Sequence, residues 1–225
     1  MDYSETIPIQ YQEGKTTFMG MDICVVPGVF IPRPETELLV RIVTELCEEK
    51  LLDDAFVLDL GTGSGIIPLG IKMLMKKSRI IGADISEDAL TVARRNLRRL
   101  SVQDNVHFIK SDMFSFFGSE YEETFDAIVS NPPYVSEKDY EKLDAWVLAE
   151  PKIALCSGAE GMDGLHIIIR ESNRFLKPGG FVAVEIGYDQ AEKVKKVFKV
   201  HGFIDIKGYR DFNGYERVIT GHKHG

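Results

Sequence analysis

Apolar and polar positions follow two periods along the chain, one typical of strands and one typical of helices. From residue 55 onwards, short apolar runs are followed by segments whose apolar residues recur every three or four positions, beginning at Ile66 and at Ser86. This alternation predicts a mostly parallel sheet covered by helices. The predicted strands are residues 56–60, 79–84, 106–110, 125–130, 181–186, 203–207 and 217–220.

The patterns at the two ends of the chain add to this prediction, and the whole chain is predicted to have an α/β, Rossmann-like fold. The link between the last two strands is too short to hold the helix of a parallel crossover, so we predict a seven-stranded, mostly parallel sheet with an antiparallel last strand. Strand-like runs at 16–19 and 22–26 predict an N-terminal β-hairpin, and helical spacing follows over 35–46. We divide the chain into residues 1–34, the hairpin with a substrate-side segment, and residues 35–225, the main domain.

Composition narrows the class of protein. The chain has 225 residues, 44% of them hydrophobic and 28% charged, and a net charge of −8. An acidic balance disfavours direct binding to nucleic acid. Because the start is polar and no apolar run approaches the ~18 residues that span a bilayer, we expect a cytoplasmic protein without membrane contact. Three cysteines without a close pair indicate neither a disulfide framework nor a metal site.

A glycine-rich turn between a predicted strand and a predicted helix indicates a nucleotide site. Glycines 61, 63 and 65 allow the backbone to turn tightly and to approach a ligand closely. Ile66 stands where the dinucleotide fingerprint requires its third glycine. The loop therefore favours S-adenosylmethionine (SAM) over NAD.

Acidic residues at the ends of three predicted strands fit the positive charge of SAM. Asp59 precedes the glycines, Asp84 is placed to accept hydrogen bonds from ribose hydroxyls, and Asp112 with Met113 follows the third strand, near the adenine. Singly, each carboxylate fits a helix cap slightly better, but together with the glycine loop they predict a class I SAM-dependent methyltransferase domain. The predicted cofactor-binding residues are Asp59, Gly61, Thr62, Gly63, Ser64, Gly65, Asp84, Ile85, Asp112, Met113 and Asn131.

The tetrapeptide Asn131-Pro132-Pro133-Tyr134 directly follows the predicted strand 125–130, at the strand end where α/β folds bind ligands. The Asn131 side-chain oxygen and the Pro132 carbonyl can both accept hydrogen bonds from one NH2 group, and Tyr134 offers an aromatic surface to the planar group that carries it. Alone, the tetrapeptide is as readily a proline-rich turn. With the glycine loop, it predicts methylation of an amide or of an exocyclic amine.

These motifs resemble the HemK/PrmC family of protein-(glutamine-N5) methyltransferases, which modify peptide chain release factors. The resemblance covers about residues 7–220, and its most specific stretch is 32–37. It implies transfer of a methyl group from SAM to the glutamine of the Gly-Gly-Gln motif of a release factor. The matching stretches are 30–37, the glycine loop, the tetrapeptide, Glu150-Pro151 with Asp163-Gly164, and 185–190.

For that reaction we expect Asn131, Pro132 and Tyr134 to be catalytic. Asn131 and Pro132 would hold the two amide hydrogens and aim the nitrogen at the methyl group. Arg33 and Glu35 are as readily an ion-paired helix start as part of the substrate wall. The predicted substrate-binding residues are Phe30, Arg33, Glu35, Asn131, Pro132, Pro133 and Tyr134.

Two departures and two alternatives accompany this prediction. Bacterial members usually carry a helical N-terminal domain that helps to dock the release factor, whereas this chain begins at the hairpin, and we expect it to correspond to the catalytic domain. Met113 stands where some relatives have tryptophan, which should weaken stacking on adenine. An N6-adenine methyltransferase would need a basic groove for DNA or RNA. A noncatalytic domain that binds SAM or a release factor would have no need of the intact tetrapeptide.

Overall fold

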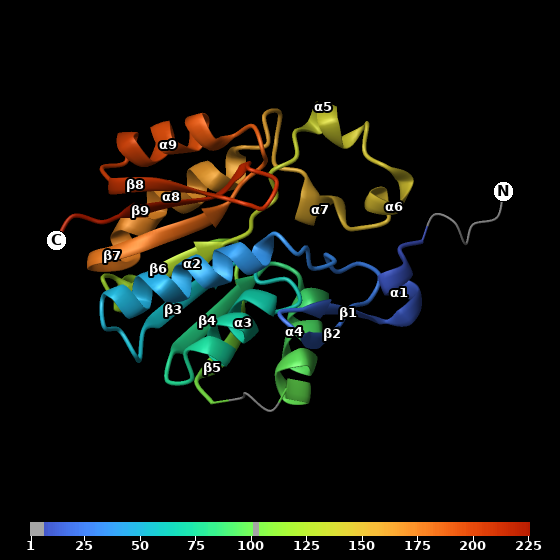
Figure 1. Cartoon of the computed structure of the whole chain (residues 1–225), viewed down its shortest axis with the longest axis horizontal. Helices are drawn as coiled ribbons and strands as arrows, with labels where there is room; N and C mark the ends of the chain where they lie inside the picture. Colours follow the sequence, from blue (N-terminus) through green and yellow to red (C-terminus); the bar gives the residue numbers. More distant parts are fainter. Residues whose placement is uncertain (1–6, 101–103) are drawn as a thin grey trace.

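The computed structural model describes residues 7–100 and 104–225 of the chain. The strands of its main sheet are β3 (Phe56–Leu60), β4 (Arg79–Asp84), β5 (Val106–Lys110), β6 (Phe125–Ser130), β7 (Leu176–Glu185), β8 (Ile204–Arg210) and β9 (Glu216–His222). In the described residues these form one seven-stranded sheet in the order β5-β4-β3-β6-β7-β9-β8 (Figure 1). Strands β3 to β7 are parallel, and β9 is antiparallel to both of its neighbours. The predicted sheet, including its antiparallel last strand, is confirmed.

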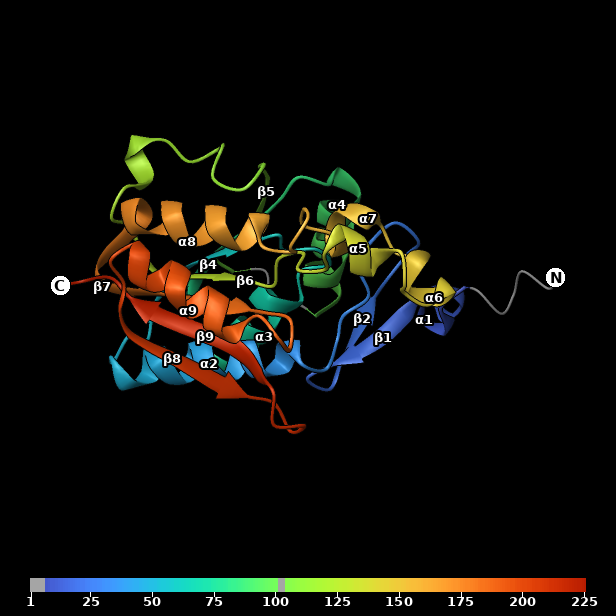
Figure 2. The same cartoon turned by 90° about the horizontal axis from the view of Figure 1, so that it is seen from above.

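Helices cover both faces of this sheet, as Figure 2 shows for α8 and α9 on one side and α2 and α3 on the other. Val57 packs with the layer that contains α2 and α3, and Leu58 packs with the layer of α8 and α9, because successive strand residues point to opposite faces. None of the helices in the described ranges is long and apolar enough to cross a membrane. The long helices are α2 (Thr36–Glu49), α3 (Ile66–Leu74), α4 (Glu87–Leu100), α8 (Asp163–Phe175) and α9 (Ala191–Val200).

The N-terminal hairpin packs against the helical layer that contains α2, α3 and α4. It consists of β1 (Lys15–Phe18) and β2 (Met21–Cys24), and the short helix α1 (Ile9–Glu13) precedes it. Phe18 and Ile23 are buried in the same core as α2. The side chain of Asn96 in α4 bonds the backbone of Cys24 and also the carbonyl of Ser64, so it links the hairpin to the glycine loop. The hairpin is thereby fixed beside the predicted cofactor site.

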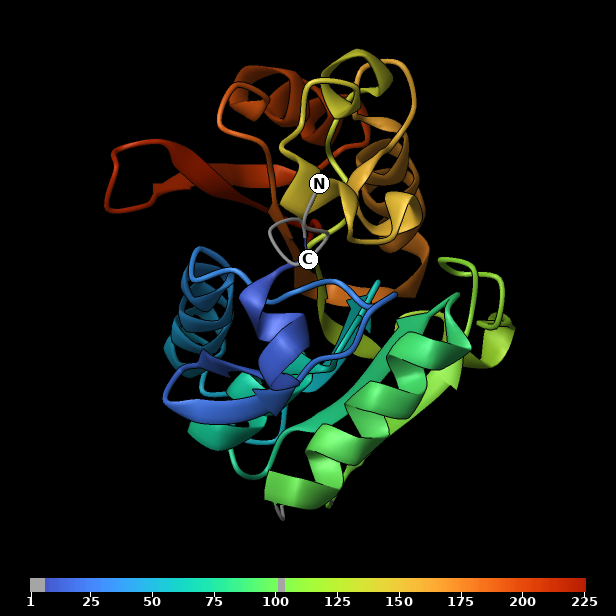
Figure 3. The ribbon, with the colours of Figure 1, turned by 90° about the vertical axis from the view of Figure 1, so that its right-hand side faces the viewer.

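A second small layer lies at the end of the sheet where the parallel strands finish (Figure 3). It contains α5 (Glu137–Tyr140), α6 (Ala145–Leu148) and α7 (Lys152–Leu155), and a bridge between Val135 and Cys156 closes its base. Away from this layer lies the 3-10 helix η2 (Ser119–Tyr121). The sequence pattern predicts none of these helices, nor α1, because three to five residues are too few to show a helical period.

The largest difference from the predicted strands is at β7, which begins at Leu176 rather than at Phe181. The run Lys177-Pro178-Gly179-Gly180 has the residues of a turn, yet it continues the strand. Leu176 pairs with Phe125, and the register then shifts before Ala127 pairs with Phe181. Such an irregularity accommodates proline and glycine within a strand.

Candidate active site

A cavity of about 430 Å³ opens at the carboxyl ends of the parallel strands, a volume typical of small-molecule sites. Its wall is formed by four parts of the chain: the segment that follows the hairpin, the glycine loop, the strand ends and the α6–α7 segment. Asp59, Gly65 and Glu35 stand outside the lining. The other predicted site residues line it: Phe30, Arg33, Gly61, Thr62, Gly63, Ser64, Asp84, Ile85, Asp112, Met113, Asn131, Pro132, Pro133 and Tyr134.

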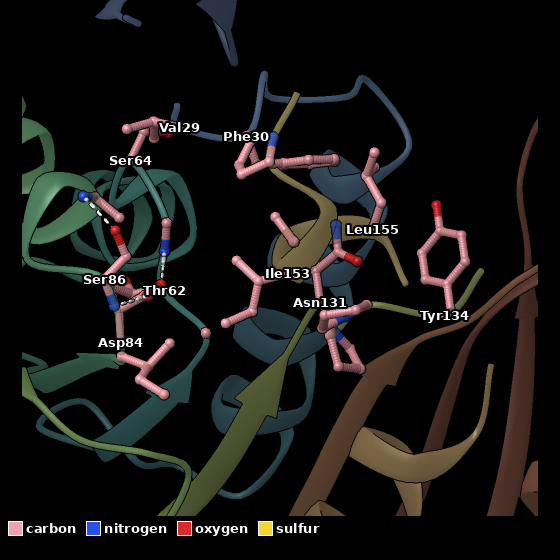
Figure 4. A pocket seen from close by; sticks show the side chains of 18 of the residues that line it. Val29, Phe30, Thr62, Ser64, Asp84, Ser86, Asn131, Tyr134, Ile153 and Leu155 are labelled. Carbon is pink, nitrogen blue, oxygen red and sulfur yellow. Dashed lines mark hydrogen bonds between the residues drawn. The ribbon is translucent and has the colours of Figure 1, made fainter. Parts of the chain in front are cut away.

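The cavity has two chemically different ends. Figure 4 shows Thr62 and Asp84 at one end and Asn131 and Tyr134 at the other, with Ile153 between them. The first end is formed by the glycine loop and by the end of β4, and the second by the residues after β6. A ligand bound along the glycine loop would therefore face the tetrapeptide across an apolar gap.

The glycine loop owes its shape to left-handed backbone conformations. Gly63 has a φ of 55° and Gly65 a φ of 83°. At Gly65 an added Cβ would also lie 3.0 Å from both the Ala93 Cβ and the Phe108 ring, so a side chain would push the loop away from α4 and β5. Gly65 thus supports the loop from behind rather than from the cavity side.

The Asp84 carboxylate holds the loop against the end of β4. Its two oxygens accept hydrogen bonds from the backbone N–H of Gly63, at 2.8 Å, and of Ser86, at 2.9 Å. Burial raises the pKa of Asp84, and these N–H groups oppose that rise. Because a carboxylate oxygen has more than one acceptor site, the predicted bonds to ribose hydroxyls remain sterically compatible with this arrangement.

Asp59 lies fully buried beneath the loop, at the end of β3. Burial raises its pKa to about 8; the nearby Thr62 hydroxyl offsets only part of that rise, and the charge of Asp84 adds to it. Both carboxylate oxygens lack a hydrogen-bond partner among the described residues, as does the Thr62 hydroxyl. Such buried polar groups are unfavourable unless another charge compensates them.

At the opposite end, the tetrapeptide presents two acceptors. Asn131 Nδ2 donates to the Thr36 hydroxyl at 3.0 Å, so the amide NH2 is directed to α2. The Asn131 side-chain oxygen and the Pro132 carbonyl receive no hydrogen bond from the residues that the structure describes. This is the pair of acceptors that the sequence predicts for one NH2 group.

The backbone after these acceptors is held from outside the cavity. Gln190 Nε2 donates to the Tyr134 carbonyl and to the Gly161 carbonyl, both at 3.1 Å. Burial, followed by the charge of Glu185, raises the pKa of the Tyr134 phenol well above its usual range, so this group stays protonated. Tyr134 is therefore suited to contact and hydrogen bonding rather than to proton abstraction.

Arg33 joins the two halves of the cavity rim. It forms an ion pair with Glu150, whose side chain is fully buried and also accepts a bond from the Ile31 N–H at 2.9 Å. The guanidinium lies 4.9 Å from the ring centre of Phe30 and 5.7 Å from that of Trp146, within cation–π range. The sequence left two interpretations of Arg33, an ion pair within the helix start and a place in the substrate wall. In the structure its ion pair is with Glu150, and the Arg33 side chain lines the cavity.

Several residues around the site carried no predicted role. Glu150, Glu185 and Gln190 belong to the stretches that match the family, but only the folded chain brings them to residues 31, 131 and 134. Thr36 also lies in a matching stretch, 30–37, but nothing in the sequence indicated its contact with Asn131. For Glu185 a signal existed, because an acidic residue within the apolar run 181–186 is unusual.

Comparisons with known proteins agree with this geometry. A family model described as a methyltransferase domain matches residues 51–213. A solved methyltransferase from Pyrococcus furiosus has the same fold, with a TM-score of 0.66 and 21% identity over 92% of this chain and 91% of that one. The fold and the cavity therefore define a class I methyltransferase.

Similar sequences identify the family. The release factor glutamine methyltransferase of Clostridium acetobutylicum is 41% identical over 214 residues, which are 95% of this chain and 74% of the relative. That of Buchnera aphidicola is 37% identical over 96% of this chain and 76% of the relative. The chain belongs to the HemK/PrmC family of release factor glutamine methyltransferases. The predicted family and methyltransferase activity are confirmed, and the N6-adenine alternative is not favoured.

Proposed function

We propose that this protein transfers a methyl group from SAM to the side-chain amide N5 of the glutamine in the Gly-Gly-Gln motif of peptide chain release factors. The observation that carries the proposal is the pair of open acceptors, the Asn131 oxygen and the Pro132 carbonyl, across the cavity from the glycine loop. A primary amide has two N–H donors on one nitrogen, which match two acceptors. The family of the relatives supplies the protein substrate.

The residues at the loop end fit SAM as the methyl donor. The sulfonium and the ammonium of SAM are positive, and the buried carboxylate of Asp59, which has no hydrogen-bond partner among the described residues, favours a cation nearby. Asp84 would bind the ribose, and Met113 would contact the adenine. Bound there, SAM supplies an electrophilic methyl group. The remaining predicted cofactor contacts at this end are Gly61, Thr62, Gly63, Ser64, Ile85 and Asp112, with Gly65 supporting the loop. Asn131, also among the predicted cofactor contacts, lies at the opposite end of the cavity.

The protein's own contribution at the other end is orientation and charge stabilisation. An amide nitrogen is a poor nucleophile because its lone pair is delocalised into the carbonyl. Asn131 and Pro132 would hold both amide hydrogens, fix the direction of the nitrogen and stabilise positive charge as it develops there. Tyr134 would contact the amide plane, and the methylated amide would lose its proton late, without a dedicated base.

The rim would exclude water and admit the glutamine. Phe30, Arg33 and Trp146 form its outer edge, and Ile153 makes the interior apolar. Removal of water strengthens the hydrogen bonds to the amide. For this reason we place residues 7–34 on the substrate side, whereas residues 1–6 of the predicted segment 1–34 lie outside the described residues. Pro133 would stand in the wall and Glu35 behind it. We expect the reaction in the cytoplasm, where translation terminates.

The test is methyl transfer from labelled SAM to a bacterial release factor. Its matched controls are the same factor with Gln→Ala in the Gly-Gly-Gln motif, and a mixture of DNA and RNA. Label on the unaltered factor only is the expected result. Label on nucleic acid would replace the proposal with the N6-adenine reaction, and SAM binding without any label would favour a noncatalytic domain.

A further inference from the structure

Glu185 is a buried carboxylate that the reaction described so far does not use. It ends β7, and only 1% of its surface is exposed. Its Oε2 atom has no hydrogen-bond partner among the described residues. It does not line the cavity, so it cannot contact a substrate there. Burial of an ionised group costs free energy, so the presence of a carboxylate at this position indicates a compensating role.

The contacts of Glu185 lead to Asn131. The side chains of Thr36 and Asn131 lie beside the carboxylate and lower its pKa, and Asn131 Nδ2 donates a hydrogen bond to the Thr36 hydroxyl at 3.0 Å. Thr36 begins α2 and is fully buried. The three residues come from the end of β6, the start of α2 and the end of β7, which are neighbours in Figure 1.

This network determines which end of the Asn131 amide faces the cavity. The oxygen and the NH2 group of asparagine have nearly the same shape, so hydrogen-bond partners decide their positions. An ionised carboxylate only accepts hydrogen bonds, and it therefore attracts the NH2 end. The oxygen is then left to face the cavity, where the proposed reaction needs an acceptor.

We propose that Glu185, together with Thr36, is a positioning residue that holds the Asn131 amide with its oxygen toward the substrate amide. This inference rests on the proposed function, because an acceptor is useful there only if the substrate presents N–H donors. The negative charge of Glu185 also polarises the Asn131 amide and makes its oxygen a stronger acceptor. Glu185 acts through Asn131 and touches neither substrate nor cofactor.

The charges around Glu185 set the pH at which this network changes. Burial raises its pKa to about 7, and the charge of Glu35 adds to the rise, whereas Thr36, Asn131 and the Arg217 guanidinium lower it. Arg217 is shared, because it also pairs with Asp211 at 3.0 Å. The phenol of Tyr134 faces the same region and stays protonated. Below about pH 7 the protonated carboxyl becomes a donor, and the preference for the Asn131 NH2 weakens.

The first test is Glu185→Gln, which keeps the shape and removes the charge. We expect kcat for release factor methylation to fall about tenfold to a hundredfold, the range seen when a partner that orients a metal ligand is removed. The Kd for SAM should stay unchanged. The wild-type kcat should rise with pH through about 7, because the ionised carboxylate is the effective form, and this rise should be absent in the variant. Thr36→Val should lower kcat to a similar extent, whereas Thr36→Ser, which keeps the hydroxyl, should retain activity.

Asp126→Asn is the matched control for loss of a buried carboxylate. Asp126 lies at the opposite end of β6, accepts a bond from the Phe56 N–H at 2.8 Å and pairs with Lys177. This variant should lower Tm and leave kcat unchanged. Glu185→Gln should lower kcat without lowering Tm, because it removes a buried charge. A wild-type kcat and pH profile in Glu185→Gln, or a loss of kcat that merely accompanies a loss of Tm, would overturn the inference.

A second readout does not depend on the substrate. The side-chain 15N amide signal of Asn131, identified by its disappearance in Asn131→Ala, should shift with a midpoint near pH 7 in the wild type and stay constant in Glu185→Gln. Absence of that titration in the wild type would refute the role of Glu185. Absence of methyl transfer by the wild type, with the titration present, would instead refute the proposed function.

Discussion

Asp59 leads to a prediction about the pH dependence of SAM binding. Its carboxyl is fully buried, its oxygens are unpartnered in the described part of the chain, and its pKa is raised to about 8. Near neutral pH it is mainly protonated. A cation bound at the loop favours the ionised form, so binding should release a proton and should become tighter as the pH rises toward the pKa of Asp59.

The size of the effect follows from that pKa. If SAM binds only the protein with ionised Asp59, the apparent Kd is multiplied by one plus the ratio of protonated to ionised Asp59. With a pKa of about 8, this factor falls roughly twentyfold between about pH 6 and 7.5. The same change equals about 1.8 kcal/mol of binding free energy. A bound-state pKa that is lowered only partly would give a smaller slope of the same sign.

Isothermal titration calorimetry measures both quantities. We would determine the Kd for SAM at several pH values, and the proton release from titrations in two buffers with different ionisation enthalpies. Asp59→Asn is the matched control, because the amino group of SAM titrates equally with both proteins. The wild type should show the steeper dependence and close to one proton released. Identical pH dependence in the two proteins, with no difference in proton release, would refute the assignment of Asp59 to the cofactor site.

Three further perturbations test other parts of the site. Asn131→Ala should lower kcat about 100- to 1000-fold and leave the Kd for SAM unchanged, because it removes an acceptor that acts on the developing charge; wild-type turnover would contradict the role of Asn131. Arg33→Met should lower the free energy of unfolding, measured with urea, by about 1–3 kcal/mol, because Glu150 is left buried without its ion-pair partner. The loss should stay in this range because the Arg33 side chain is 23% exposed and solvent screens the pair. An unchanged urea midpoint would show that the pair is not stabilising. Gly65→Ala should lower Tm and weaken SAM binding. The backbone φ of 83° and the close contact with Ala93 would add a strain of about 1–3 kcal/mol. Normal binding by a folded variant would show that the loop tolerates a side chain.

The central sheet could be predicted because its strands are apolar on both faces. The bounds of β3 to β6 agree with the predicted ranges residue for residue. The start of β7 could not be predicted, since Pro178 and Gly179 have the local chemistry of a turn and only the pairing of Leu176 with Phe125 extends the strand. The short helices α5 to α7 depend on contacts such as that between Val135 and Cys156, which no local period encodes.

The residues of the site also fall into those that the sequence indicates and those that only the fold reveals. Residues within contiguous motifs, such as Gly63 and Asn131, line the cavity, and the sequence could point to them because the motif itself carries the chemistry. Thr36 and Gln190 act on Asn131 and Tyr134 from positions 95 and 56 residues away in the sequence. Their roles arise only when α2 and the segment after β7 come to lie beside the end of β6. The sequence contains these residues but not their proximity.

The most direct test of the central claim is to locate the methyl group. A bacterial release factor would be incubated with SAM and the protein, digested, and sequenced by tandem mass spectrometry across its Gly-Gly-Gln peptide. We predict a mass increase of one methylene on the glutamine side chain, absent with Asn131→Ala. Methylation at any other residue, or an unmodified glutamine in a reaction where SAM is consumed, would contradict the account.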